Sequence, residues 1–150
     1  MAAGGATRSD SVRAGLATVP DDVGIVLVHD AARPLASKAL FERVIRAVAG
    51  GADGAVPAVA VTDTMKRVEG DRVTETVSRE GLVGVQTPQA FRVAALRAAH
   101  RHGGIDTDDA ALVEADGGTV VVVEGERRNL KVTVPDDLEL ARALLDGARA

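Results

Sequence analysis

The sequence predicts an α/β protein in which helices cover both faces of a central, mainly parallel sheet. The first of three supporting observations is a continuous apolar run from Gly24 to Val28, as expected for a strand covered on both faces. The second is an amphipathic helical pattern over residues 37–49. The third is another apolar run over residues 54–61, which completes a strand–helix–strand unit.

Composition narrows the class of protein. A chain of 150 residues is long enough for one domain, spanning residues 1–150. Apolar residues make up 46% but aromatic residues only 1%, and the net charge is −4, which argues against a nucleic-acid partner. The absence of cysteine excludes disulfides and thiolate metal sites. No apolar run approaches roughly 20 residues, so we expect a cytoplasmic protein without a membrane partner.

The first element is a loop containing Gly4 and Gly5, followed by a helix over residues 11–18 that Ser9 or Asp10 caps. A glycine-rich loop at the start of a helix can bind an anion through free backbone N–H groups. An ordinary capped loop explains the same pattern, because glycine pairs are common at turns.

Asp30 and Arg33 follow the first strand, at the carboxyl end where α/β sheets bind ligands. Arg33 offers a planar donor fork for phosphate or carboxylate. The alternatives are a helix cap for Asp30 and a surface ion pair for Arg33.

We interpret His29 as packed and hydrogen-bonded, and His100 and His102, at a helix end, as solvated.

The alternation over residues 64–68 and 72–77 predicts a β-hairpin that leaves the sheet. Such an arm, about residues 62–80, has little core of its own and is expected to pack on a partner subunit. Lys66 and Arg67 would in the simplest interpretation be edge charges that oppose aggregation.

The remaining patterns predict helices over residues 37–49, 93–102, 106–115 and 136–148. They also predict a short strand and turn within 82–91, a buried strand over 119–123 and a short strand or extended piece over 129–133. Ser37 is expected to cap the first of these helices and Pro135 to stand at the first position of the last. Asp106 or Thr107 is the expected cap of the helix that ends at residue 115, although this acidic segment also resembles a metal cluster in composition.

Five motifs occur in a fixed order: Val28–Pro34, Asp63–Lys66, Gln86–Phe91, Thr107–Ala110 and Asn129–Leu138. Together they closely resemble the 2-C-methyl-D-erythritol 4-phosphate cytidylyltransferase family. The resemblance implies a Rossmann-like nucleotidyltransferase three-layer sandwich with a protruding hairpin arm. It also implies transfer of a cytidylyl group from CTP to methylerythritol phosphate, with Mg²⁺ as cofactor and pyrophosphate as second product, in the non-mevalonate isoprenoid pathway.

The resemblance also implies roles for particular residues. Gly5 and Ser11 would lie on the base and ribose side of CTP, and Lys131 would face its phosphates. Asp30 would lie between the two substrates, near Mg²⁺. Because the attacking group is already a phosphate anion, no general base is needed.

For the acceptor, the resemblance assigns Arg33, Thr64 and Arg79 to methylerythritol phosphate. Thr64 and Arg79 would reach across from the arm of the partner in a homodimer. The family begins with a strand and a glycine-rich loop that have no counterpart before Met1, so the match covers about the last two-thirds of its length. We therefore expect this chain alone to bind CTP weakly and to turn over little. The alternative is a non-catalytic module that keeps the arm and the sugar-phosphate side of the site.

Overall fold

The computed structural model describes residues 2–102 and 108–147. The helices are α1 (Arg8–Leu16), α2 (Lys38–Ala49), α3 (Val93–His102), α4 (Asp109–Ala115) and α5 (Pro135–Asp146). The strands are β1 (Ile25–Val28), β2 (Gly54–Ala60), β3 (Met65–Glu69), β4 (Arg72–Val77), β5 (Val83–Val85), β6 (Gln89–Arg92) and β7 (Val120–Glu124).

The central sheet is mixed, which corrects the expectation of a mainly parallel sheet. β6 lies between β1 and β2 and is antiparallel to both. β2 also pairs with β7 in parallel and, at its end, with β5 in antiparallel orientation. No sequence pattern indicates β6, because four residues directly after the Thr87-Pro88 turn are too few to show a period.

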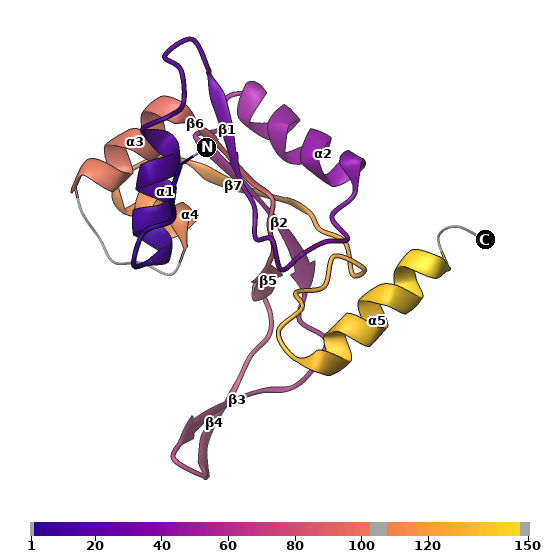
Figure 1. The fold of residues 1–150 in the computed structure, drawn as a ribbon. Coiled ribbons are helices and arrows are strands. Elements are labelled where there is room, and N and C mark those ends of the chain that lie inside the picture. Colours follow the sequence, from indigo (N-terminus) through magenta and orange to yellow (C-terminus); the bar gives the residue numbers. More distant parts are fainter. Residues whose placement is uncertain (1, 103–107, 148–150) are drawn as a thin grey trace.

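The sheet is the middle of three layers, as expected. Figure 1 shows α2 on one face and α1, α3 and α4 on the other. Successive side chains of a strand point to opposite faces, and β1 follows this rule. Ile25 and Leu27 pack with the core beneath α2, whereas Val26 and Val28 pack with the core around the fully buried Phe91.

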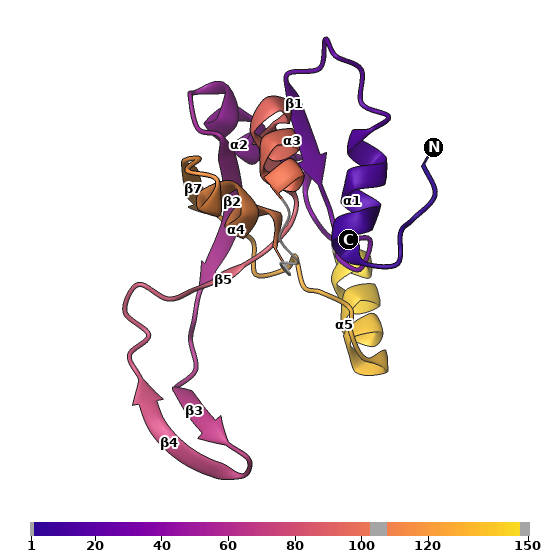
Figure 2. The same cartoon turned by 90° about the vertical axis from the view of Figure 1, so that its left-hand side faces the viewer.

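The predicted hairpin arm is confirmed. Within the described part of the chain, β3 and β4 pair only with each other, and nearly all of their residues are exposed. Gly70, in the turn between them, has a φ of +61°, a conformation that favours glycine. Both views show the arm extending away from the sheet, so it contributes nothing to the core (Figures 1 and 2).

Helix α1 begins earlier than predicted. Thr7 is its N-cap, and Thr7 and Asp10 form a reciprocal capping box in which each side chain accepts from the backbone N–H of the other. The prediction that Ser9 or Asp10 caps a helix starting at residue 11 is therefore wrong. Ser37 does cap α2, where the backbone N–H of Leu40 donates to its Oγ at 3.1 Å.

Smaller differences concern the last third of the chain. β7 is only partly buried, with Val122 exposed, because β2 is its one strand partner among the described residues. Residues 129–133 form no strand. Pro135 stands at the start of α5, as predicted. The predicted caps Asp106 and Thr107 lie outside the described residues.

None of the helices described is long and apolar enough to span a membrane.

Candidate functional site

A pocket of about 280 Å³ lies where β1 ends, and it gathers charged side chains from distant parts of the chain. Its lining includes the cations Arg8, Arg33 and Lys131, the carboxylates Asp30 and Asp108, and the amides and hydroxyl of Gln86, Gln89 and Thr87. Three cations around two carboxylates suit a ligand that carries phosphate groups. Of the seven site residues predicted from sequence, the pocket lining contains Asp30, Arg33 and Lys131.

Asp30 and Lys131 form an ion pair across the pocket, with 3.0 Å between Lys131 Nζ and Asp30 Oδ2. Asp30 follows β1 with only His29 between them, and its backbone N–H donates to Thr87 Oγ1 at 3.0 Å. The segment carrying Lys131 is held beside the same turn, because the N–H of Val132 donates to the carbonyl of Ala32 at 2.8 Å. The side chains of Lys131 and Asp30 remain 48% and 24% exposed, so a ligand can reach both.

Arg33 is fixed at the floor of the same corner. Its Nη1 donates to the carbonyl of Asn129 at 2.8 Å, and its backbone N–H closes a turn on the carbonyl of Asp30 at 2.9 Å. Partial burial lowers the pKa of the Arg33 guanidinium, and the neighbouring Asp30 carboxylate opposes that shift. An arginine remains charged at neutral pH despite such a shift. Arg33 is thus a partly buried, oriented cation and not a surface ion-pair residue.

A buried amide network supports this corner, and sequence reasoning gave it no role. Asn129 is fully buried and donates from Nδ2 to the carbonyl of Thr87 at 2.8 Å. Gln86 Nε2 donates to the carbonyl of Glu126 at 2.9 Å, while its Oε1 accepts from the N–H of Glu126 at 3.0 Å. The network holds residues 126–131 against the Gln86–Thr87 turn. The available signal was a cluster of polar residues within the Gln86–Phe91 motif.

Gly5 and Ser11 lie together at the start of α1, but neither lines the pocket. The N–H of Gly5 donates to Ser11 Oγ at 3.0 Å, and that hydroxyl donates to the carbonyl of Thr7 at 3.1 Å. A Cβ on Gly5 would lie 2.1 Å from the Cβ of Asp10, so the close approach of this loop requires glycine. The same turn places Arg8 in the pocket. The resemblance to the family extends to this Gly4–Val12 segment, which would contact the cytidine nucleotide, but it assigned Arg8 no individual role.

Thr64 and Arg79 lie on the exposed arm and not in the pocket of their own chain. Arg79 Nη1 donates to the carbonyl of Thr62, which joins the two sides of the arm near its base. Within one chain, the structure therefore does not bring Thr64 and Arg79 together with Asp30 and Arg33.

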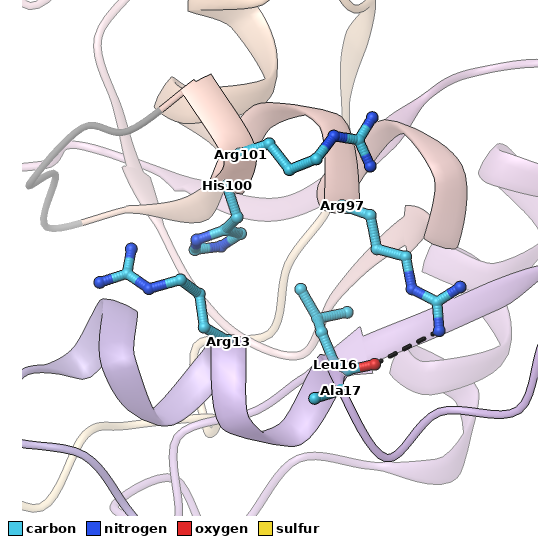
Figure 3. Close-up of a pocket in the computed structure, with 6 residues that line it drawn as sticks. All are labelled: Arg13, Leu16, Ala17, Arg97, His100 and Arg101. Atoms are coloured by element: carbon cyan, nitrogen blue, oxygen red, sulfur yellow. Dashed lines mark hydrogen bonds between the residues drawn. The ribbon is translucent and has the colours of Figure 1, made fainter.

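The histidines differ from one another. His29 is hydrogen-bonded, with Nδ1 3.1 Å from Thr87 Oγ1, and its ring packs edge-on against Phe41. The expectation that His100 is solvated is wrong. His100 is buried, with Nε2 2.9 Å from Oδ1 of the fully buried Asp109. It also lines a second pocket of about 390 Å³ between α1 and α3 (Figure 3).

The donor set around Asp30 fits a magnesium ion shared with a ligand. Within residues 2–102 and 108–147, no three or more His, Cys, Asp or Glu side chains are grouped closely enough to hold a metal by themselves. Mg²⁺ is commonly bound by one or two carboxylates together with substrate phosphates and water. Asp30 provides one such carboxylate at the edge of a cationic pocket.

The fold and pocket define an α/β protein with a pocket that gathers three cations and two carboxylates where β1 ends. The family described as IspD, 2-C-methyl-D-erythritol 4-phosphate cytidylyltransferase, matches residues 1–147. The chain belongs to this family.

Three relatives illustrate the similarity. A Salinibacter ruber protein named 2-C-methyl-D-erythritol 4-phosphate cytidylyltransferase is 50% identical over 146 residues, covering 94% of this chain and 60% of the relative. A Solidesulfovibrio magneticus protein named bifunctional enzyme IspD/IspF is 50% identical over 140 residues, covering 91% and 35%. The crystal structure of the Thermus thermophilus cytidylyltransferase matches with a TM-score of 0.87 at 45% identity, covering 98% and 72%. The chain thus spans less than two thirds of the length of these two curated relatives.

Proposed function

We propose that this chain takes part in transfer of a cytidylyl group from CTP to 2-C-methyl-D-erythritol 4-phosphate, releasing pyrophosphate. Family membership supports the reaction class and the two substrates. The observation that carries the proposal is the convergence of Asp30, Arg33 and Lys131 on one pocket from distant parts of the chain. We place the activity in the cytoplasm, where CTP is made.

In this proposal an oxygen of the acceptor phosphate attacks the α-phosphorus of CTP. A new P–O bond forms while the bond from the α-phosphorus to the bridging oxygen breaks, and pyrophosphate leaves with the electron pair. Lys131 stabilises the charge that develops on the phosphates, and Arg33 binds the acceptor phosphate. Because the nucleophile is already an anion, no side chain has to remove a proton.

Asp30 would hold Mg²⁺, which neutralises phosphate charge when it is bound. Its contact with Lys131 keeps the carboxylate turned into the pocket. Gly5 and Ser11 contact the base and ribose side of CTP, next to Arg8 in the same turn.

We further propose a homodimer in which Thr64 and Arg79 of each arm complete the acceptor site of the other chain. The arm is exposed and extends away from the sheet (Figure 2), and none of its residues lines the pocket of its own chain, which supports this exchange. An arm without a core of its own needs another surface for stable packing.

The test is pyrophosphate release from CTP and Mg²⁺, with and without methylerythritol phosphate. Enzyme at a concentration comparable to substrate makes slow turnover measurable. We expect acceptor-dependent release that falls roughly 10²–10³-fold in Lys131→Met, as for removal of a donor that stabilises transition-state charge. The fold should survive, because a half-exposed ion pair contributes about 0–1 kcal/mol.

Lys38→Met is the matched control, since Lys38 is an exposed lysine on α2 that pairs with Glu42 and does not line the pocket. It should leave the rate unchanged. Two results would contradict the proposal: pyrophosphate release that does not depend on methylerythritol phosphate, and a release rate that Lys131→Met leaves unchanged. Binding without any release would favour the non-catalytic module.

A further inference from the structure

A buried carboxylate joins three helices beside the pocket. Asp109, the first residue of α4, is 0% exposed. Its Oδ2 lies 2.7 Å from Arg8 Nη2 on α1, and its Oδ1 lies 2.9 Å from His100 Nε2 on α3. A buried charge is tolerated only when it is paired and hydrogen-bonded. The first residue of α4 therefore also links α4 to α1 and α3 through its side chain.

Arg8 connects this carboxylate to the functional pocket. It lines the pocket together with Asp30, Arg33 and Lys131. Its Nη1 is enclosed and makes no hydrogen bond to any residue the structure describes. A guanidinium is a rigid, planar fork, so pairing Nη2 with Asp109 fixes the plane in which its other N–H groups lie. The Arg8 side chain as a whole is 34% exposed, so a phosphate oxygen in the pocket can reach the guanidinium and offer it a charge-assisted hydrogen bond.

His100 fixes the other side of Asp109. Figure 3 shows its ring projecting from α3 toward α1, at the edge of the second pocket. Because His100 binds Oδ1, the Asp109 carboxylate has a defined rotation, and Oδ2 remains for Arg8. The chain of contacts runs from α3 through α4 to α1 and ends in the pocket.

We propose that Arg8 is an anion-binding residue of this pocket, and that the Asp109 carboxylate, held by His100, positions its guanidinium. The inference rests on the proposed function for the class of anion, a phosphate group of the nucleotide or of the pyrophosphate product. Arg8 contacts the ligand, whereas Asp109 and His100 act through Arg8. If Arg8 were only a counter-ion for Asp109, its loss would change stability but not anion affinity.

The experiment is calorimetric titration of pyrophosphate into the full chain, with Arg8→Gln, Asp109→Asn and the double variant compared with the parent. Each single substitution should weaken binding roughly tenfold or more, as expected for a lost charge-assisted hydrogen bond. The double variant should bind no more weakly than Arg8→Gln, because Asp109 acts only through Arg8. Arg13→Gln, which removes an α1 arginine paired with Asp10, should bind like the parent.

Thermal unfolding of each variant separates positioning from folding. His100→Gln keeps an N–H donor for Asp109 and should retain more affinity than His100→Ala. Unchanged affinity in folded Arg8→Gln, additive losses in the double variant, or no pyrophosphate binding by the parent would overturn the inference. The titration needs no turnover, so it stands if cytidylyl transfer fails. Conversely, transfer at a normal rate by Arg8→Gln contradicts the inference and leaves the proposed function intact.

Discussion

Single residues in this protein carry charge in two distinct settings. The Asp30–Lys131 pair is open to solvent and contributes little to stability. Its two charged groups therefore matter mainly because a ligand can contact them. The Asp109 carboxylate is enclosed, and losing Arg8 or His100 leaves it buried with only one of its two partners. Substitutions at the first site should therefore change function, and substitutions at the second should change both function and folding.

Asp137 provides a pH-dependent test at this scale. Its carboxylate accepts hydrogen bonds from the N–H and hydroxyl of Thr133 and from the N–H of Val134, which lower its pKa from the ordinary value of 3.8. A depressed pKa gives a stabilisation that is present above pH 3.8 and is lost as pH falls through the lowered value.

We expect Asp137→Asn to be less stable than the parent at pH 7, because it lacks the charge at the start of α5. The difference should vanish at low pH, where the parent is also neutral at this position. Urea unfolding of both proteins between pH 2 and 7 measures it. The pKa of Asp10 is also lowered, but Asp10 is present in both proteins, so its contribution cancels in the difference between their unfolding free energies. A difference that does not vary with pH would contradict the prediction.

At the scale of elements, β6 is the strand on which the sheet depends. It joins β1 to β2, and its Phe91 fills the core between the sheet and α3. Gly54 on β2 lies directly against that ring, where a Cβ would come within 2.9 Å of Phe91 Cδ1. Phe91 therefore takes part both in strand pairing and in core packing.

Phe91→Ala should lower the free energy of unfolding by about 3–5 kcal/mol, since it leaves a cavity in a fully packed site. Val73→Ala, on the exposed strand β4, should change it by no more than about 1 kcal/mol. Urea unfolding followed by circular dichroism measures both. Similar losses at the two positions would mean that β6 is not central to stability.

At the scale of the whole molecule, the body and the arm have different roles. The body has two packed faces, while the arm exposes Met65, Val68 and Val73 on a two-stranded sheet. An isolated hairpin is marginally stable in water, so this surface fits the proposed subunit contact.

The double variant Val68→Asp/Val73→Asp should therefore be monomeric in sedimentation equilibrium while keeping the circular dichroism of the parent. Its affinity for methylerythritol phosphate should fall, because Thr64 and Arg79 would no longer reach a partner. Val134→Asp is the control, with the same 54% exposure as Val73 but at the start of α5. A parent that sediments as a monomer would contradict the dimer.

The candidate site was only partly predictable. Asp30 and Arg33 follow an obvious strand, and Lys131 belongs to a motif of the family, so all three could be named in advance. Arg8 was given no role of its own within the Gly4–Val12 segment, because its position depends on a carboxylate from α4 that pairs across helices. His100 was misjudged for the same reason: a histidine near a helix end looks solvated until its partner is known.

The sequence by itself determined the local structure: the Ser37 cap, the start of α5 at Pro135, the hairpin arm and the strand β1 that precedes Asp30. These features depend on backbone preferences and periods that act over a few residues. Only the tertiary structure decided that β6 runs antiparallel between β1 and β2 and that Asp109 is buried against Arg8 and His100. Strand order and buried ion pairs depend on contacts between residues far apart in the chain, and no local pattern records them.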